Sequence, residues 1–257
     1  MYYRTYAQPD YTQITLEDLY SNNIPQQRNS QTYHVETIPD VWYNSAAPVS
    51  AALHHIFSTA ADTPMLYSEY KIPKTSGGFR DICAPNEELK SVQRDILKAI
   101  MRAGNQVHDC AYAYVPNRTC KDALIRHQQN NSKWFYKYDL SNFFPSCTEK
   151  VVRAMFDRTY PFCCLSSEIK DNLIRFSIYN GALPQGSPLS PLFSNLIMLP
   201  FDYAMEFSVA HNGGVYTRYA DDILISYPQK LSERLTTKHI LEHLDPAFKL
   251  NVAKTRV

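Results

Sequence analysis

The sequence has 257 residues, of which 44% are hydrophobic and 20% are charged, and its formal net charge is +1. This length supports one large domain or two to three subdomains, and the composition excludes a chain that is disordered throughout. The net charge alone does not indicate nucleic-acid binding, but the charge is uneven. Residues 65–137 hold 12 basic and 7 acidic side chains, whereas residues 138–257 hold 12 of each. This distribution favours a phosphate-binding surface followed by a segment rich in Asp.

Cysteine spacing and hydropathy exclude several classes of protein. None of the six Cys residues are spaced as CxxC, so we expect neither a zinc site nor a secreted disulfide framework. Free thiols in a reducing cytoplasm are the expected state. The first residues lack the apolar run of a signal peptide, and no stretch is apolar enough to span a membrane. The sequence therefore predicts a cytoplasmic protein.

The first half of the chain predicts an extension followed by a hairpin and two helices. Residues 1–60 are interpreted as an N-terminal extension, with helical spacing over residues 48–61. Residues 66–84 predict a β-hairpin, because two extended runs flank the turn dipeptide Gly77-Gly78. Further helices are expected over residues 87–103 and 119–130.

The second half predicts a strand over residues 134–140 and two short strands within residues 215–227. The loop that contains Pro184-Gln185-Gly186 precedes a helix expected to continue from near Pro191 to about Ser208. Other helices are expected over residues 148–158, 166–178 and 231–244. The fold class is therefore predicted to be α+β.

Three aspartates are the densest chemical signal. An isolated Asp221-Asp222 pair is usually a surface turn, but apolar residues flank this pair on both sides and indicate a turn rooted in the core. Asp139 ends another predicted strand, a position where Asp more often caps a helix or forms a turn. Three acids that converge from two strand ends would form an oxygen-ligand site for two Mg²⁺ ions.

Five segments in order carry a resemblance to a known family. Tyr219-Ala220-Asp221-Asp222 resembles the YxDD motif of reverse transcriptases, and residues 138–144 (YDLSNFF) resemble their first catalytic motif. Residues 183–195 (LPQGSPLSPLFSN) are similar to the LPQG–SP–N motif. The hairpin of residues 72–80 and the Lys-Thr segment of residues 248–255 also match. The sequence thus resembles prokaryotic, non-retroviral enzymes of the retron, group II intron and phage-defence types.

The resemblance implies a right-hand polymerase fold of fingers and palm, in which helices flank an antiparallel palm sheet. The fingers are expected over residues 61–137, with a further part between residues 150 and 185, and the palm over residues 138–257. The family continues into a thumb beyond the segment that ends at Val257. We therefore expect the chain without a thumb to bind duplexes weakly and to be poorly processive.

The resemblance also implies roles for individual residues. Asp139, Asp221 and Asp222 would hold two Mg²⁺ ions, or Mn²⁺ in their place, with the Leu140 carbonyl as a further ligand. Phe144 would select deoxynucleotides, because its ring would clash with a 2′-hydroxyl. Some of these residues also have an ordinary structural interpretation. Lys74 and Arg80 would be hairpin charges that aid solubility, Phe144 a core Phe, and Lys254 an exposed loop lysine. The residues expected to bind the nucleotide are Lys74, Arg80, Phe144, Gln185, Gly186 and Lys254.

The predicted activity is that of an RNA-directed DNA polymerase of a bacterial retroelement or defence system. It would add dNTPs to a primer 3′ end on an RNA template, with a structured non-coding RNA as a further partner. The alternatives are an RNA-templated RNA polymerase, a maturase-like RNA-binding module and a template-independent nucleotidyl polymerase. The nearest match to the Asn-Ala-x-x-His motif of retron enzymes is residues 122–127 (DALIRH), which lack the Asn and are one residue longer.

Overall fold

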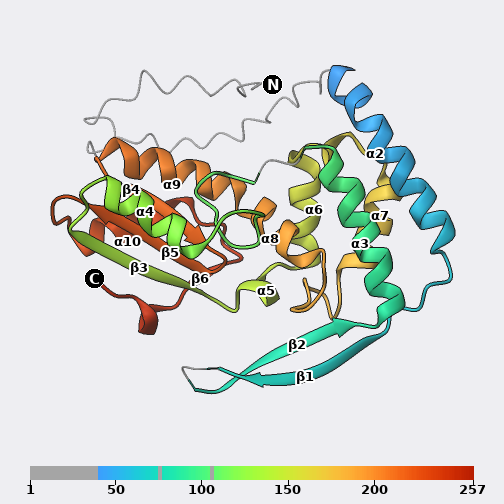
Figure 1. The fold of residues 1–257 in the computed structure, drawn as a ribbon, viewed down its shortest axis with the longest axis horizontal. Coiled ribbons are helices and arrows are strands. Elements are labelled where there is room, and N and C mark those ends of the chain that lie inside the picture. The colour runs from blue at the N-terminus through green and yellow to red at the C-terminus, as the bar shows by residue number, and fades with distance from the viewer. Residues whose placement is uncertain (1–39, 75–76, 105–106) are drawn as a thin grey trace, which may run out of the picture. The chain divides into compact units, whose positions relative to one another are not determined.

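The computed structural model describes residues 40–74, 77–104 and 107–257, with side chains from Asn44 onward, so residues 1–39 of the predicted extension lie outside it. Its strands are β1 (Tyr67–Pro73), β2 (Phe79–Pro85), β3 (Trp134–Ser141), β4 (Val215–Tyr219), β5 (Asp222–Tyr227) and β6 (Lys249–Leu250) (Figure 1). Its α-helices are α2 (Asp40–Thr59), α3 (Glu87–Arg102), α4 (Cys120–Gln129), α5 (Phe143–Ser146), α6 (Glu149–Arg158), α7 (Ser167–Ser177), α8 (Ser190–Ile197), α9 (Leu199–His211) and α10 (Glu233–His243). Two short 3-10 helices, η1 (Phe162–Cys164) and η2 (Val252–Lys254), complete the set.

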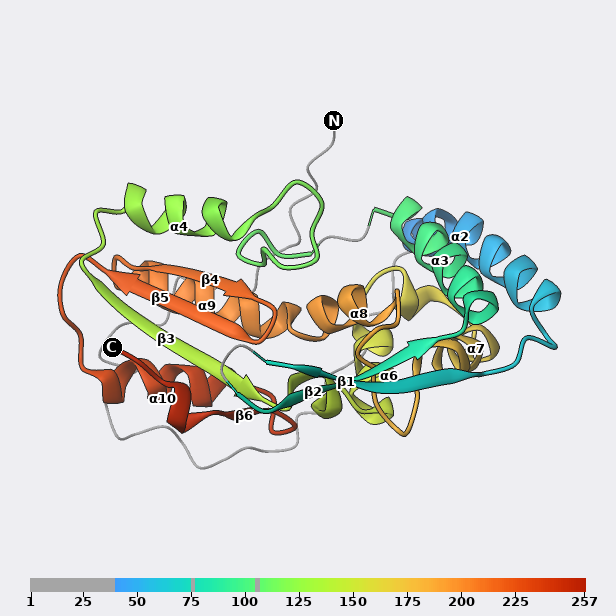
Figure 2. The same ribbon diagram turned by 60° about the horizontal axis from the view of Figure 1, so that its bottom comes forward.

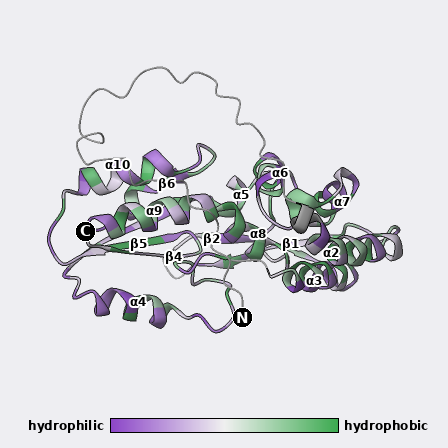
Figure 3. Cartoon of the chain, turned by 90° about the horizontal axis from the view of Figure 1, so that it is seen from above, coloured by the Kyte–Doolittle hydropathy of each residue, from purple (hydrophilic) through white to green (hydrophobic). Residues whose placement is uncertain are grey.

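The central sheet has the order β4-β5-β3-β6, and its paired strands are antiparallel. Helices α9 and α10 lie on one face and α4 on the other (Figures 2 and 3). Successive side chains of β3 alternate between these faces. Tyr136 and Tyr138 are fully buried on the α10 side, where the Tyr138 hydroxyl lies 3.1 Å from Thr237 Oγ1. The antiparallel sheet with flanking helices that the sequence predicted is present.

The predicted hairpin is confirmed as β1 and β2, which pair antiparallel from Tyr67–Pro85 to Pro73–Phe79. Gly77 and Gly78 have φ angles of 87° and 79°, a region that glycine enters without steric cost. After β2, the Asn86 side chain accepts a hydrogen bond of 3.0 Å from the Leu89 amide and caps α3. The cap fixes the direction in which the chain leaves the hairpin.

Helix α2 differs from the predicted extension. It begins at Asp40 rather than near residue 48, and it contains Pro48. Val49, Leu53 and Phe57 are buried in the main core. The Phe57 ring stacks on Phe176 of α7, with ring centroids 5.6 Å apart. This helix therefore buries an apolar face against the core.

The single helix expected from near Pro191 to Ser208 is wrong. The structure has two helices, α8 and α9, separated at Met198, and α9 ends at His211. Pro200 lies in the first turn of α9. Proline has no amide hydrogen to donate to the preceding turn, and at the start of a helix that loss has little cost. Helix α9, which follows the break, packs against β4.

A buried histidine on helix α4 forms hydrogen bonds to the sheet. His127 is fully buried, its Nδ1 lies 2.6 Å from Ser226 Oγ, and its Nε2 lies 2.8 Å from Thr217 Oγ1. Burial lowers the pKa of His127 from 6.5 to about 4, and the nearby Arg126 charge contributes to this fall. The ring is therefore neutral in the folded protein near pH 7.

This histidine predicts a loss of stability in mild acid. The unfolded chain takes up the proton near pH 6.5, whereas the folded chain resists it until about pH 4. The free energy of unfolding should fall between these pH values by at most about 3 kcal/mol from this group. Denaturant unfolding across this range measures the fall, with His127→Gln as the control. If the fall is equally large in the control, another group causes it.

Candidate active site

The turn between β4 and β5 brings the three predicted carboxylates together. Asp139 pairs with Asp222 in the β3–β5 register, and the Leu140 amide donates a hydrogen bond of 3.0 Å to the Asp221 carbonyl. Asp139 is buried, and Asp221 and Asp222 are half-buried. Ala220 has a left-handed φ of 57° at the turn. Asp139 and Asp222 lie on the α4 face of the sheet, because strand residues alternate and Tyr138 faces α10.

Charge repulsion is built into this turn. The pKa of Asp221 is raised above its ordinary value, first by burial and then by the carboxylates of Asp139 and Asp222. Like charges held this close raise the free energy of the fully ionised state. A cation at this place would relieve that repulsion.

Two lysines and an asparagine contact these carboxylates. Lys254 Nζ donates to Asp139 Oδ2 at 2.9 Å, and Asn251 Nδ2 donates to Asp139 Oδ1 at 3.0 Å. Lys137 Nζ lies 3.0 Å from Asp222 Oδ1. The hydrogen bond to Asp139 is the main reason that the pKa of Lys254 is raised. Lys137 was not predicted from the sequence, although its position two residues before Asp139 on a strand places both on one face.

The C-terminal segment delivers Lys254 by running back along β3. The Arg256 amide donates to the Lys137 carbonyl at 3.0 Å, and the Lys137 amide donates to the Arg256 carbonyl at 2.9 Å. The Asn251 amide donates to the Asp139 carbonyl at 2.8 Å. These backbone bonds explain why the Lys-Thr segment, far along the chain, lies beside Lys137 and Asp139.

The donor set fits a hard cation. Among the residues that the structure describes, no three His, Cys, Asp or Glu side chains already form a metal-binding cluster. Three carboxylates from one turn and its neighbouring strand nevertheless supply the oxygen donors that Mg²⁺ prefers. The pKa of Asp221 is raised first by burial and then by its two acidic neighbours, so a cation beside this carboxylate would favour its ionised form.

The predicted sugar-binding residue Phe144 has an aromatic neighbour that was not predicted from the sequence. The Phe144 ring centroid lies 5.5 Å from that of Phe143 and 6.4 Å from that of Tyr114. Tyr114 is 51% exposed. Its pKa is raised by burial first and by Asp221 second, and Arg80 opposes the rise. Tyr114 therefore lies within electrostatic range of the hairpin arginine and of the carboxylates.

The Gln185-Gly186 loop lies against the hairpin. The Gln185 carbonyl accepts a hydrogen bond of 2.8 Å from the Cys83 amide of β2. A Cβ on Gly186 would lie 3.0 Å from the Cys83 carbonyl oxygen, and the φ of Gly186 is 124°. Glycine here permits close approach to β2. The buried Gln185 Oε1 has no hydrogen-bond partner among the described residues, so it can accept one from a ligand.

The hairpin cations are less closely tied to the site. Arg80 is exposed on β2, opposite Ile72 in the hairpin register. Lys74 is exposed near the hairpin tip, where its amide donates to the Gly78 carbonyl at 3.0 Å. Within the described part of the chain, no hydrogen bond or ion pair links the Lys74 side chain to the carboxylates. Its nucleotide-binding role stays a prediction.

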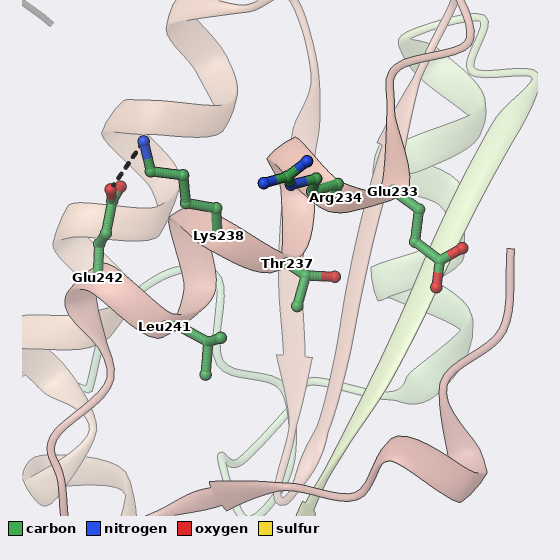
Figure 4. Close-up of a pocket in the computed structure, with 6 residues that line it drawn as sticks. All are labelled: Glu233, Arg234, Thr237, Lys238, Leu241 and Glu242. Atoms are coloured by element: carbon green, nitrogen blue, oxygen red, sulfur yellow. Dashed lines mark ion pairs between the residues drawn. The ribbon is translucent and has the colours of Figure 1, made fainter. Parts of the chain in front are cut away.

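A cavity of about 670 Å³ lies beside α10 (Figure 4). It is lined by Glu233, Arg234, Thr237, Lys238, Leu241 and Glu242. Helix α10 covers the sheet face opposite the carboxylates, and none of the predicted site residues line this cavity. The cavity is therefore separate from the candidate active site.

Comparison with known proteins decides the family. A family model described as "Reverse transcriptase (RNA-dependent DNA polymerase)" matches residues 72–257, the span that holds the carboxylates and their lysine partners. The chain belongs to this family. The match begins near the end of β1 and includes β2 and the sheet. The resemblance drawn from five separate motifs is thereby confirmed.

Curated relatives of this reverse transcriptase chain include three retron enzymes. The chain is 28% identical over 200 residues to the Escherichia coli retron Ec73 reverse transcriptase, covering 74% of this chain and 63% of that protein. It is 35% identical to the E. coli retron Ec83 enzyme, covering 62% of this chain and 52% of the relative. It is 28% identical to the Myxococcus xanthus retron Mx65 enzyme, covering 86% and 55%. The chain thus spans less than two thirds of the length of these relatives.

A solved structure supports the fold. Telomerase from Candida albicans, in complex with a fragment of telomeric RNA, matches with a TM-score of 0.51 and 12% identity. The match covers 74% of this chain and 42% of the telomerase chain. At this identity the likeness concerns the fold alone, and it confirms the predicted α+β polymerase fold class. Among the described residues, no helix is long and apolar enough to cross a membrane.

Proposed function

We propose that this reverse transcriptase chain is an RNA-directed DNA polymerase that adds dNTPs to the 3′ end of a primer. One observation carries the proposal: Asp139 and Asp222 are paired at the ends of β3 and β5, and Asp221 in the adjoining turn is close enough for both charges to raise its pKa. The family match and the retron relatives support a retron-type enzyme. A cytoplasmic location and a structured RNA partner belong to the same proposal. The division into fingers over residues 61–137 and palm over residues 138–257 belongs to the same proposal.

Asp139, Asp221 and Asp222 would hold two Mg²⁺ ions, with the Leu140 carbonyl as a further ligand. When bound, such ions activate the primer hydroxyl and stabilise the charge on the leaving pyrophosphate. Lys137 contacts Asp222, and Lys254 contacts Asp139. Both lysines would have to leave these carboxylates for the ions to be held there. Lys254 would then be free to approach the triphosphate, where its ammonium group would donate a proton to the leaving pyrophosphate.

The substrate is held by residues around the carboxylates. Arg80 offers a planar fork of donors that matches phosphate oxygens, and Lys74 offers a point charge beside it. Phe144 and Tyr114 form an aromatic pair next to the site, a surface suited to a sugar ring. Gln185 Oε1, which has no hydrogen-bond partner among the described residues, would accept one from the nucleotide or the template.

Removal of the Phe144 ring should weaken the preference for deoxyribonucleotides over ribonucleotides. In Phe144→Ala, the loss of the ring opens space for a 2′-hydroxyl, and the preference for dNTPs over rNTPs should fall by at least about tenfold. Steady-state kcat/KM for dATP and ATP on one primed RNA measures this ratio. Phe143→Leu serves as the control, because Phe143 is buried in the core. Unchanged discrimination in Phe144→Ala would move the gate to another residue.

The proposed substrate class is tested by extension of a DNA primer annealed to RNA, with either dNTPs or rNTPs supplied. We expect Mg²⁺-dependent extension with dNTPs and little with rNTPs. Equal or better use of rNTPs would identify an RNA polymerase instead. RNA binding that persists in Asp221→Ala, together with no extension by the unaltered chain under any condition, would favour a maturase-like binding module.

A further inference from the structure

Arg218, the residue before the last of β4, carries a fully buried charge. Its side chain has no exposed surface, and neither has that of Asp202 on α9. Arg218 Nε donates to Asp202 Oδ1 at 2.8 Å, and Nη2 donates to Oδ2 at 2.6 Å. This two-point geometry matches the planar guanidinium to the planar carboxylate. The pair is therefore fixed in orientation as well as in distance.

The third nitrogen of the guanidinium is aimed at the turn. Arg218 Nη1 donates to the Ala220 carbonyl at 3.1 Å and to Asn195 Oδ1 at 3.1 Å. The Ala220 carbonyl belongs to the peptide that joins Ala220 to Asp221. Ala220 has a φ of 57°, a left-handed conformation that is unfavourable for any residue with a Cβ. The contact therefore holds a strained residue whose next peptide leads into the carboxylate pair.

Neighbouring elements immobilise the guanidinium. The Tyr216 hydroxyl donates to Asp202 Oδ1 at 2.7 Å, so the carboxylate receives three donors. Asn195 of α8 donates through Nδ2 to the Ala113 carbonyl at 2.9 Å, which fixes its amide. The network thus connects two helices, a strand and the loop before α4. A rigid support of this kind is what a precisely oriented site requires.

The alternative is that the pair only stabilises the core. Buried ion pairs often give no more stability than apolar residues of the same shape, so stability alone explains the pair poorly. We propose that Arg218 is a positioning residue, whose hydrogen bond to the Ala220 carbonyl maintains the left-handed turn that orients Asp221 and Asp222. The kinetic part of this inference rests on the proposed polymerase function, but the structural part does not.

Arg218→Lys should break the link between the ion pair with Asp202 and the hydrogen bond to the Ala220 carbonyl. Lysine keeps the positive charge but has one ammonium group, which cannot serve Asp202 and the Ala220 carbonyl together with the same geometry. We expect kcat for primer extension to fall about tenfold to a hundredfold, because small misplacements of reacting groups have effects of this size. The KM for dNTP should change less than about threefold, because the nucleotide contacts are untouched.

A double-mutant cycle separates positioning from a general effect on the core. Glycine adopts positive φ without strain, so a turn with Ala220→Gly depends less on an external support. The fall in kcat caused by Arg218→Lys should therefore be at least about threefold smaller in an Ala220→Gly background. An equal fall in both backgrounds would overturn the inference. If Arg218→Lys does not fold, Tyr216→Phe, which loosens Asp202 by one hydrogen bond, replaces it in the cycle.

Amide hydrogen exchange of the peptide that contains residues 216–224 provides a readout independent of activity. Exchange in the turn should be faster in Arg218→Lys and unchanged in Leu173→Ala, a buried substitution in α7 that lowers stability elsewhere. Equal exchange in the wild type and Arg218→Lys would overturn the positioning role. Inactivity of the wild type would instead contradict the proposed function, and the exchange result would still decide the structural part.

Discussion

Asp222→Asn should abolish primer extension while leaving the fold intact. The substitution preserves the shape of the side chain but removes a negative charge from the place where Asp139, Asp221 and Asp222 meet. Loss of a metal-ligand charge of this kind should lower kcat by at least about a hundredfold, or about 2.7 kcal/mol in activation free energy. Single-turnover extension of a primed RNA measures the effect without interference from product release.

The control for this substitution is Asp95→Asn on the surface of α3. Asp95 forms an exposed ion pair with Lys98 and lies far along the chain from the carboxylates. The extension rate of the Asp95→Asn variant should therefore match that of the unaltered chain. Thermal unfolding of both variants should give melting temperatures close to the starting value. An Asp222→Asn variant that retains more than about a tenth of the rate would count against metal ligation by this residue.

Asp202→Ala should destabilise the fold strongly. It leaves the buried Arg218 guanidinium without its carboxylate and also removes the acceptor of the Tyr216 hydroxyl. An uncompensated buried charge of this kind costs about 3–5 kcal/mol. Equilibrium unfolding in urea should show this loss as a lower midpoint with an unchanged slope, or as failure to fold.

The matched control removes both charges together. Asp202→Leu combined with Arg218→Met replaces the pair with apolar side chains, so no charge is left unpaired. This double variant should lose much less stability than Asp202→Ala, although it lacks the donor to the Ala220 carbonyl. A loss below about 1 kcal/mol in Asp202→Ala would mean that water or another group reaches Arg218.

The predictions from sequence were strongest where local pattern and chemistry agree. The hairpin was predicted because Gly77-Gly78 occupies a turn that requires positive φ, and the structure has this turn. The strands around Asp221-Asp222 were predicted from the apolar runs on both sides. These features depend on residues that are neighbours along the chain, so the sequence displays them directly.

The features that were not predicted depend on contacts between distant residues. The start of helix α2 at Asp40 was not predicted, and its packing against the core depends on Phe176, a residue far along the chain on which Phe57 stacks. The contact between Lys254 and Asp139 spans 115 positions and requires the C-terminal segment to run along β3. Nothing local distinguishes Tyr114 from the other tyrosines, and its place beside Phe144 becomes visible only in the fold.

The most direct test of the polymerase proposal is a template swap. Two RNA templates share one primer site and differ only in the first unpaired base, and a single dNTP is supplied in each reaction with Mg²⁺. The proposal predicts that the incorporated nucleotide changes to the complement of the template base, and that Asp222→Asn incorporates none. Incorporation of the same nucleotide on both templates, or none by the unaltered chain, would contradict it.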